Sequence, residues 1–257
     1  MLATITILTS FLFATLYPLC FWISSKDPLK NAFHRFHLGL PTIVANVTTF
    51  FIIFKPIPVD IKVALIIWSI FLIGVLSYYW QKGSPHPSIV TLPCLIGLYG
   101  LIRWESHVID SSVVFHLASL LSGLILCSSL YAMNLGHWYL NVHGLAISHL
   151  TRAAIVFGCV LVLRVFWDTG YLLFGNVFYA EEKISVLQFL SSLDGFLLCL
   201  GVLFGTLLPF IALLFAQETI RLKNTQSSTG ILYVILCSLL IGDITYKYYF
   251  IKFHVFL

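Results

Sequence analysis

Charged residues are scarce in this sequence. Asp, Glu, Lys and Arg together make up 9% of the 257 residues, whereas 60% are hydrophobic. A soluble domain normally has about a quarter of its residues charged. So few charges cannot cover a surface that faces water, which excludes a soluble globular protein and predicts an integral membrane protein whose first partner is the lipid bilayer. The sequence also lacks a basic run, so we expect no nucleic-acid partner.

Recurrent catalytic and cofactor motifs are absent as well. The chain has no Walker A sequence, no nucleophile elbow, no HExxH pair and no dinucleotide fingerprint. Its six cysteines are spread one to each of six apolar segments, without a CxxC pair, which predicts small buried side chains and neither a disulfide framework nor a zinc site. The two halves show no repeat by inspection, which weakens a transporter interpretation without excluding it.

Long apolar runs are what the sequence has instead. A helix that spans a bilayer needs about 20 apolar residues. Eight candidate runs are present, at residues 3–23, 39–54, 61–80, 89–104, 112–134, 150–174, 187–214 and 230–251. The connections are too short for a soluble domain, so we predict an all-α fold: a polytopic transmembrane bundle of about eight helices, forming one integral membrane domain over residues 1–257. Gly201 and Gly205 form a GxxxG pair that permits close helix approach.

The connection over residues 134–149 is the strongest functional pointer. It has no Asp, Glu, Lys or Arg but carries His137, Trp138, Tyr139, His143 and His149. These side chains favour the membrane interface, and histidine also binds metals and cofactors. The alternative interpretation is that they are ordinary interfacial side chains that reach toward the headgroups.

Further histidines fall on the same predicted side of the membrane. His34, His37 and His86 lie in connections of the same parity as the 134–149 segment. Imidazoles gathered at one face could ligate iron or copper, bind a haem axially, or hydrogen-bond a quinone carbonyl. The predicted cofactor-binding residues are His37, His137, Trp138, Tyr139, His143, His149 and Arg152. The predicted metal ligands are His34, His37, His137, His143 and His149.

Four charged residues interrupt the last three apolar runs: Arg164, Asp168, Asp194 and Asp243. Ionisable residues inside a span are costly and normally face partners in the protein interior. Arg164 and Asp168 are one helical turn apart and are expected to pair. This buried charge group predicts either a proton or ion path, or a polar clasp that holds the last three helices together. The other charged residues, Glu105 and Lys247 among them, we assign to connections and helix ends.

Two segments resemble those of known proteins. Leu135-Gly136-His137-Trp138-Tyr139-Leu140 and Thr225-Gln226-Ser227-Ser228-Thr229-Gly230-Ile231-Leu232-Tyr233 resemble segments of uncharacterised bacterial multi-helix membrane proteins, and the Phe33–Leu38 stretch is similar to the start of their second helix. This resemblance covers about a tenth of the chain. It implies a bacterial cytoplasmic (inner) membrane location, and it carries over no activity or catalytic residue.

Three functions therefore stay open. The leading hypothesis is an integral subunit of a redox or electron-transfer membrane complex that binds haem or quinone at the histidine-rich face. An ion-coupled transporter or exporter that uses the buried charge group is the alternative from a different class. A structural subunit, whose charges pair with neighbouring membrane subunits, is the third.

Overall fold

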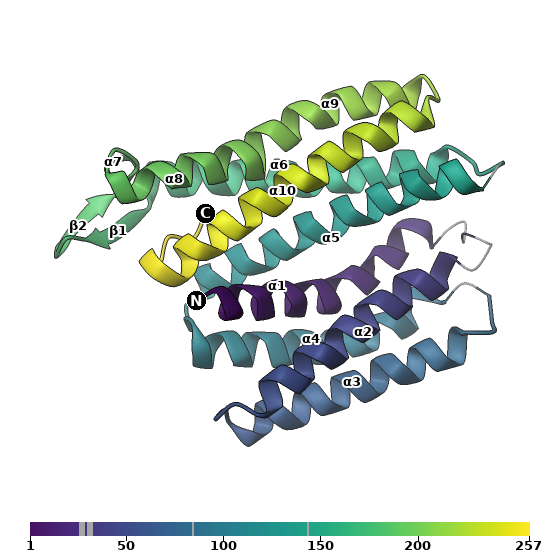
Figure 1. The fold of residues 1–257 in the computed structure, drawn as a ribbon, viewed down its shortest axis with the longest axis horizontal. Coiled ribbons are helices and arrows are strands. Elements are labelled where there is room, and N and C mark those ends of the chain that lie inside the picture. Colours follow the sequence, from purple (N-terminus) through teal and green to yellow (C-terminus); the bar gives the residue numbers. More distant parts are fainter. Residues whose placement is uncertain (26–28, 30–32, 84, 143) are drawn as a thin grey trace. The chain divides into compact units, whose positions relative to one another are not determined.

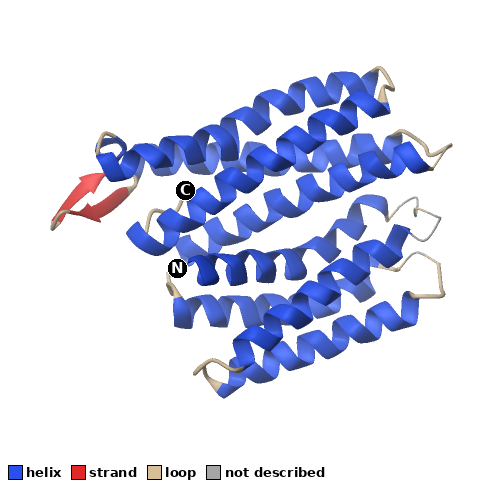
Figure 2. Ribbon diagram, viewed as in Figure 1, coloured by secondary structure: helices blue, strands red, loops and turns tan. Residues whose placement is uncertain are grey.

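The computed structural model describes residues 1–25, 29, 33–83, 85–142 and 144–257. In this part of the chain eight helical runs are long and apolar enough to cross a membrane. Figure 2 shows helices throughout, apart from one small β-hairpin. The predicted all-α bundle of eight spans is therefore confirmed, and the chain is an integral membrane protein.

The chain divides into two compact units, which we describe separately as the N-terminal unit (Leu2–Gly123) and the C-terminal unit (Met1 and Leu124–Leu257). The prediction of a single membrane domain over residues 1–257 stays a prediction.

The N-terminal unit packs its helices around an aromatic core. Its elements are α1 (Leu2–Leu16), the 3₁₀-helix η1 (Tyr17–Ser24), α2 (Phe33–Ile53), α3 (Val59–Tyr79), α4 (Pro87–Val108) and the first part of α5 (Val113–Asn141). Among α1 to α4 and η1, neighbours along the chain pack on each other, and α4 returns to pack on α1 and η1 (Figure 1). Phe11 of α1 stacks on Trp68 of α3, with ring centroids 5.0 Å apart. Pro18 lies in the first turn of η1, where it removes an α-helical hydrogen bond.

The C-terminal unit holds the rest of α5, then α6 (Ser148–Phe174), β1 (Asn176–Tyr179), β2 (Glu182–Ser185), α7 (Val186–Leu190), α8 (Leu193–Val202), the π-helix η2 (Leu203–Leu207), α9 (Leu208–Arg221) and α10 (Thr225–Phe253). The hairpin turn has positive φ at Ala180 and Glu181. In Figure 1 the hairpin lies at the end of the α8–α9 run, and α10 runs beside that run along its length.

The predicted close approach at the GxxxG pair is confirmed. A Cβ added at Gly205 would lie 2.4 Å from the Tyr246 ring, and one at Gly242 of α10 would lie 2.2 Å from the Gly205 Cα. Two glycines therefore let η2 and α10 touch backbone to backbone.

Several predicted boundaries are wrong: the second and eighth helices begin at Phe33 and Thr225 rather than at 39 and 230, and two further runs differ as well. The fifth run continues as helix to Asn141 rather than ending at 134, so His137, Trp138 and Tyr139 are helical. No proline interrupts the chain after residue 134, and the side-chain amide of Asn141 donates back to the His137 carbonyl at 3.2 Å. The seventh run does not begin at 187 as one helix, because α7 stops at Leu190 and Ser192 caps a new helix by accepting from the Gly195 N–H.

Candidate functional site

The two predicted histidines of α2 lie buried within the N-terminal unit. His37 is 2% exposed, its Nδ1 is 2.6 Å from the Tyr17 hydroxyl, and its ring stacks on Phe33 at 3.8 Å between centroids. His34 lies one turn earlier, and its Nε2 donates to the Tyr79 carbonyl at 2.9 Å. If the His34 ring is neutral, this leaves its Nδ1 as a hydrogen-bond acceptor. The Tyr17 hydroxyl thus holds the His37 ring in position, and the Tyr79 carbonyl holds the His34 ring.

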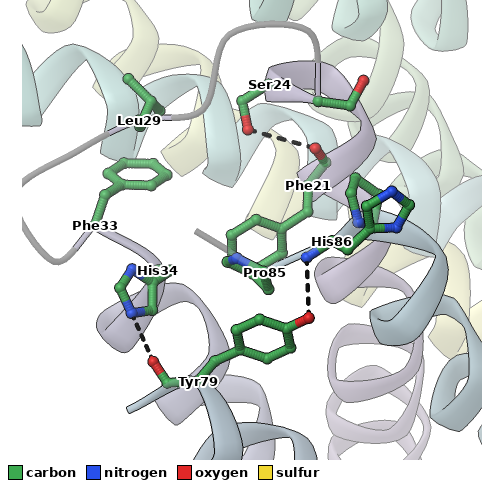
Figure 3. Close-up of a pocket in the computed structure, with 10 residues that line it drawn as sticks. Phe21, Ser24, Leu29, Phe33, His34, Tyr79, Pro85 and His86 are labelled. Atoms are coloured by element: carbon green, nitrogen blue, oxygen red, sulfur yellow. Dashed lines mark hydrogen bonds between the residues drawn. The ribbon is translucent and has the colours of Figure 1, made fainter. Parts of the chain in front are cut away.

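A cavity of about 190 Å³ lies beside His34, and Figure 3 shows the side chains that line it. It is lined by residues from the end of the first span to the start of the fourth: Phe21, Ser24, Ser25, Leu29, Phe33, His34, Tyr79, Pro85, His86 and Pro87. Tyr79 joins the two histidines of the cavity, because its carbonyl accepts from His34 and its hydroxyl accepts from the His86 backbone N–H at 3.4 Å. We call this space the His34/His86 cavity.

The His86 imidazole is the available polar group of this cavity. Among the described residues it has no hydrogen-bond partner, since the hydrogen bonds of His86 are made by its backbone N–H and its backbone carbonyl. The two serine hydroxyls are already used, Ser24 toward the Phe21 carbonyl and Ser25 toward the Trp22 carbonyl. The walls are mainly aromatic and proline rings, so a ligand here would meet flat apolar surfaces and one free imidazole.

The predicted cofactor residues of the C-terminal unit lie at the end of α5 and the start of α6. His137 Nδ1 is 3.2 Å from the Tyr233 hydroxyl, and the Tyr139 hydroxyl donates to the Ala146 carbonyl. His149 Nδ1 accepts from Arg152 at 2.9 Å, so this nitrogen is not available to a metal. Trp138 lies on the same last turns of α5, and His143 lies outside the described residues.

A metal centre finds no support in this arrangement. Within the described residues, which omit His143, no three His, Cys, Asp or Glu side chains gather in a way that could hold a metal ion. The predicted metal ligands His34 and His37 lie in the N-terminal unit, and His137 and His149 lie in the C-terminal unit. The metal and haem predictions therefore stay untested predictions.

The buried charge group is the most polar feature of the C-terminal unit. Arg164 Nε lies 2.9 Å from Asp168 Oδ1 on α6, which confirms the predicted pair within this helix. On α10, Lys247 Nζ donates to both carboxylate oxygens of Asp243. The exposed fractions of the four residues are 1% for Arg164, 2% for Asp168, 6% for Asp243 and 0% for Lys247. Two cations and two carboxylates thus occur together within the spans.

Hydroxyl groups connect α6, η2 and α10 at this group. Thr206 donates to Asp168 Oδ2 at 2.5 Å, and Tyr246 donates to the same oxygen at 3.0 Å. The Arg164 guanidinium carbon lies 4.1 Å from the Tyr246 ring centroid, in a cation–π contact. The close approach at Gly205 and Gly242 positions Thr206 and Tyr246 for these contacts.

Asp194, the fourth predicted member, has other partners. It lies in the first turn of α8, its side chain is 47% exposed, and its carboxylate is 3.8 Å from Lys252. It also accepts from the Tyr179 hydroxyl at 2.9 Å, which raises the pKa of Tyr179 because the hydrogen bond favours the protonated phenol. The buried group therefore contains Lys247, and the prediction that Asp194 belongs to it is wrong.

Sequence reasoning also missed a buried carboxylate in the N-terminal unit. Glu105 near the end of α4 is 0% exposed, and it accepts from Ser119 at 2.5 Å and lies 2.6 Å from His116 Nδ1 on α5. Ser106 lies 3.1 Å from His116 Nε2. The sequence did contain a signal for this contact. Glu105 and His116 lie on either side of the short connection between α4 and α5, so their side chains can meet when the two helices pack antiparallel.

Comparison with known proteins adds no further constraint. No family model, no curated protein and no solved structure matches this chain. Its function has to be argued from its own residues and their geometry.

Proposed function

We propose that this protein is an integral membrane subunit of a redox complex and that it binds the headgroup of a quinone in the His34/His86 cavity. The observation that carries this proposal is the His86 imidazole on the wall of an aromatic cavity, which has no hydrogen-bond partner in the part of the chain that the structure describes. An imidazole N–H can donate to a quinone carbonyl, while Phe21, Phe33 and Tyr79 offer flat surfaces to the ring.

The size and depth of the cavity fit this ligand. Sites for drug-sized ligands enclose about 300–1,000 Å³, so a cavity of about 190 Å³ suits one substituted ring with its tail outside and is too small for a porphyrin. Its walls come from the ends of spans Leu2–Ser24 and Val59–Tyr79 and the starts of Phe33–Ile53 and Pro87–Val108. Span ends lie at the membrane interface, a depth that the headgroup of a lipid-soluble quinone can reach.

Partners follow from the same chemistry. A quinone site needs an electron donor or acceptor, and we infer that neighbouring subunits of the complex supply it. The proposed location is the bacterial cytoplasmic membrane, which agrees with the resemblance of the two sequence segments.

A quinone titration tests the proposal. Trp22 directly follows Phe21 of the cavity wall in the sequence, and its indole N–H donates to Thr91 at 3.0 Å, so a quinone bound against Phe21 should quench its fluorescence. The purified protein in detergent is titrated with a short-tailed ubiquinone and a short-tailed menaquinone. We expect saturable quenching that is reduced by Trp22→Phe, and a weakening of affinity of about tenfold in His86→Ala, as loss of one hydrogen bond of about 1.4 kcal/mol predicts.

His107→Ala is the matched control. His107 is an exposed histidine near the end of α4, away from the lining residues of the cavity. It should bind quinone as the unchanged protein does. Equal affinity in His86→Ala and His107→Ala, or no saturable quenching at all, would reject the cavity as a quinone site and leave a structural subunit as the better account.

A further inference from the structure

We propose that the buried charge group of the C-terminal unit, formed by Arg164, Asp168, Asp243 and Lys247, is a site that conducts protons across the membrane. This function is independent of quinone binding, because it involves other residues in the other unit. The argument rests on what the group contains, how its members are linked and where it lies along α10.

One ion pair of the group contains an arginine and the other contains a lysine, and these two side chains differ in whether they can release a proton. An arginine keeps its proton under all protein conditions, and Arg164 Nε lies 2.9 Å from the Asp168 carboxylate. Lysine and aspartate can both exchange protons, and Lys247 Nζ contacts the Asp243 carboxylate directly. The charges of Arg164 and Asp243 interact, as do those of Arg164 and Lys247.

The proton balance of such a site is simple. In the ionised pair the mobile proton is on Lys247 Nζ. Its release to one aqueous phase leaves a neutral amine beside the Asp243 carboxylate, and a proton from the other phase then binds that carboxylate and passes to the amine. One proton enters for each proton that leaves, and no electron moves.

The groups around this pair are themselves polar or titratable. On α10 the side chains of Asp243, Tyr246 and Lys247 share one helical face, because they are three and four residues apart. From η2, Thr206 lies 3.0 Å from the Tyr246 hydroxyl, and from α6 Asp168 accepts from both hydroxyls. From α5, Cys127 also interacts electrostatically with Lys247.

The site lies close to one end of α10. Lys247 is six residues before Phe253, or roughly 9 Å at 1.5 Å per residue. At that end Lys252 and Asp194 are 3.8 Å apart and about half exposed, and the Tyr249 hydroxyl donates to the Asp194 carbonyl. Toward the other end, buried Ser238, Thr229 and Ser228 add hydroxyls along α10. The site thus lies near an exposed ion pair at one end of α10, and buried hydroxyls occur at intervals toward the other end.

A purely structural clasp explains this arrangement less well. A buried ion pair adds little net stability, and apolar side chains of similar volume often stabilise a fold as much or more. Inside a span, ionisable residues mark ion and proton pathways.

Proton flux into vesicles tests the inference. The full chain is reconstituted in liposomes that contain a pH-sensitive dye, and a potassium diffusion potential drives protons inward. We expect the unchanged protein to acidify the interior faster than protein-free vesicles do. Lys247→Arg keeps the cation but cannot release its proton, so flux should fall to the protein-free background while the variant stays folded.

Two further variants complete the test. Asp243→Leu combined with Lys247→Met removes both charges at once, and it should fold and conduct no protons. Glu218→Gln changes an exposed carboxylate of α9 and should leave the flux unchanged. The inference is overturned if the unchanged protein gives only background flux, or if Lys247→Arg or the folded double variant conducts as well as the unchanged protein. Because His86→Ala should conduct normally, failure of this inference is distinguishable from failure of the quinone proposal.

Discussion

Lys247 and Asp243 lie one turn apart on α10, and the Lys247 ammonium donates to both oxygens of the Asp243 carboxylate while its own side chain has no contact with solvent. A lysine side chain is thus held inside a membrane span by a carboxylate of the same helix. This pair makes the C-terminal unit sensitive to changes that remove one charge and leave the other.

Removal of one partner should destabilise the protein more than removal of both. Asp243→Asn leaves the Lys247 cation without its carboxylate, a change that costs about 3–5 kcal/mol when the pair is buried. Asp243→Leu combined with Lys247→Met should lose much less stability. Thermal unfolding in one detergent measures both, and equal or additive losses would show that the pair does not act as a unit.

Gly242→Ala should disrupt the contact of α10 with η2. The added Cβ would lie 2.2 Å from the Gly205 Cα, so the backbones must separate, at a cost of about 1–3 kcal/mol. The matched control is Gly170→Ala on α6, where nothing lies within 4 Å of the added Cβ. A lower midpoint of thermal unfolding is expected for Gly242→Ala alone, and two indistinguishable midpoints would contradict the close approach.

His116→Ala should destabilise the N-terminal unit. The imidazole lies 2.6 Å from the buried Glu105 carboxylate, and a hydrogen bond to a charged group is worth about 1.5–3 kcal/mol. His107→Ala removes an exposed imidazole of the same unit and should change little. Chemical denaturation of the two variants side by side checks this, and an unchanged midpoint for His116→Ala would show that Glu105 does not need this partner.

Tyr179 should ionise at higher pH than an ordinary tyrosine. Its pKa is raised because its hydroxyl donates to the Asp194 carboxylate. A raised pKa in the folded state means that this contact stabilises the fold at pH values below the ordinary tyrosine pKa of about 10, and that the contribution is lost as the pH rises through the folded value. Tyrosinate absorbance during an alkaline titration, compared with Asp194→Asn, measures this. If Asp194→Asn does not lower the pKa of one tyrosine, the contact is absent in solution.

The spans were predictable because hydropathy alone decides them. A run of about 20 apolar residues has one low-energy solution in a bilayer, a helix, so all eight spans are found close to their expected places. The Arg164–Asp168 pair was predictable for a similar reason, because i,i+4 spacing places both side chains on one helical face.

The burial of Lys247 was not predicted, because the sequence position of a residue near the end of a span does not show whether its side chain is buried. A lysine close to the end of an apolar run normally reaches the interface, but the carboxylate of Asp243 one turn earlier lets this one stay inside. The His34/His86 cavity was equally hidden, since four elements separated by up to about 70 residues form it. Only packing brings His86 toward His34, and hydropathy contains no information on that.

Analysis of the quinone content of the purified protein tests the central claim most directly. The protein is purified in mild detergent, extracted with organic solvent, and the extract is analysed by mass spectrometry beside the extract of His86→Ala. The quinone proposal predicts a membrane quinone in the extract of the unchanged protein and a marked depletion in His86→Ala. Equal quinone in both extracts, together with equal affinity on titration, would contradict the assignment of quinone binding to the His34/His86 cavity.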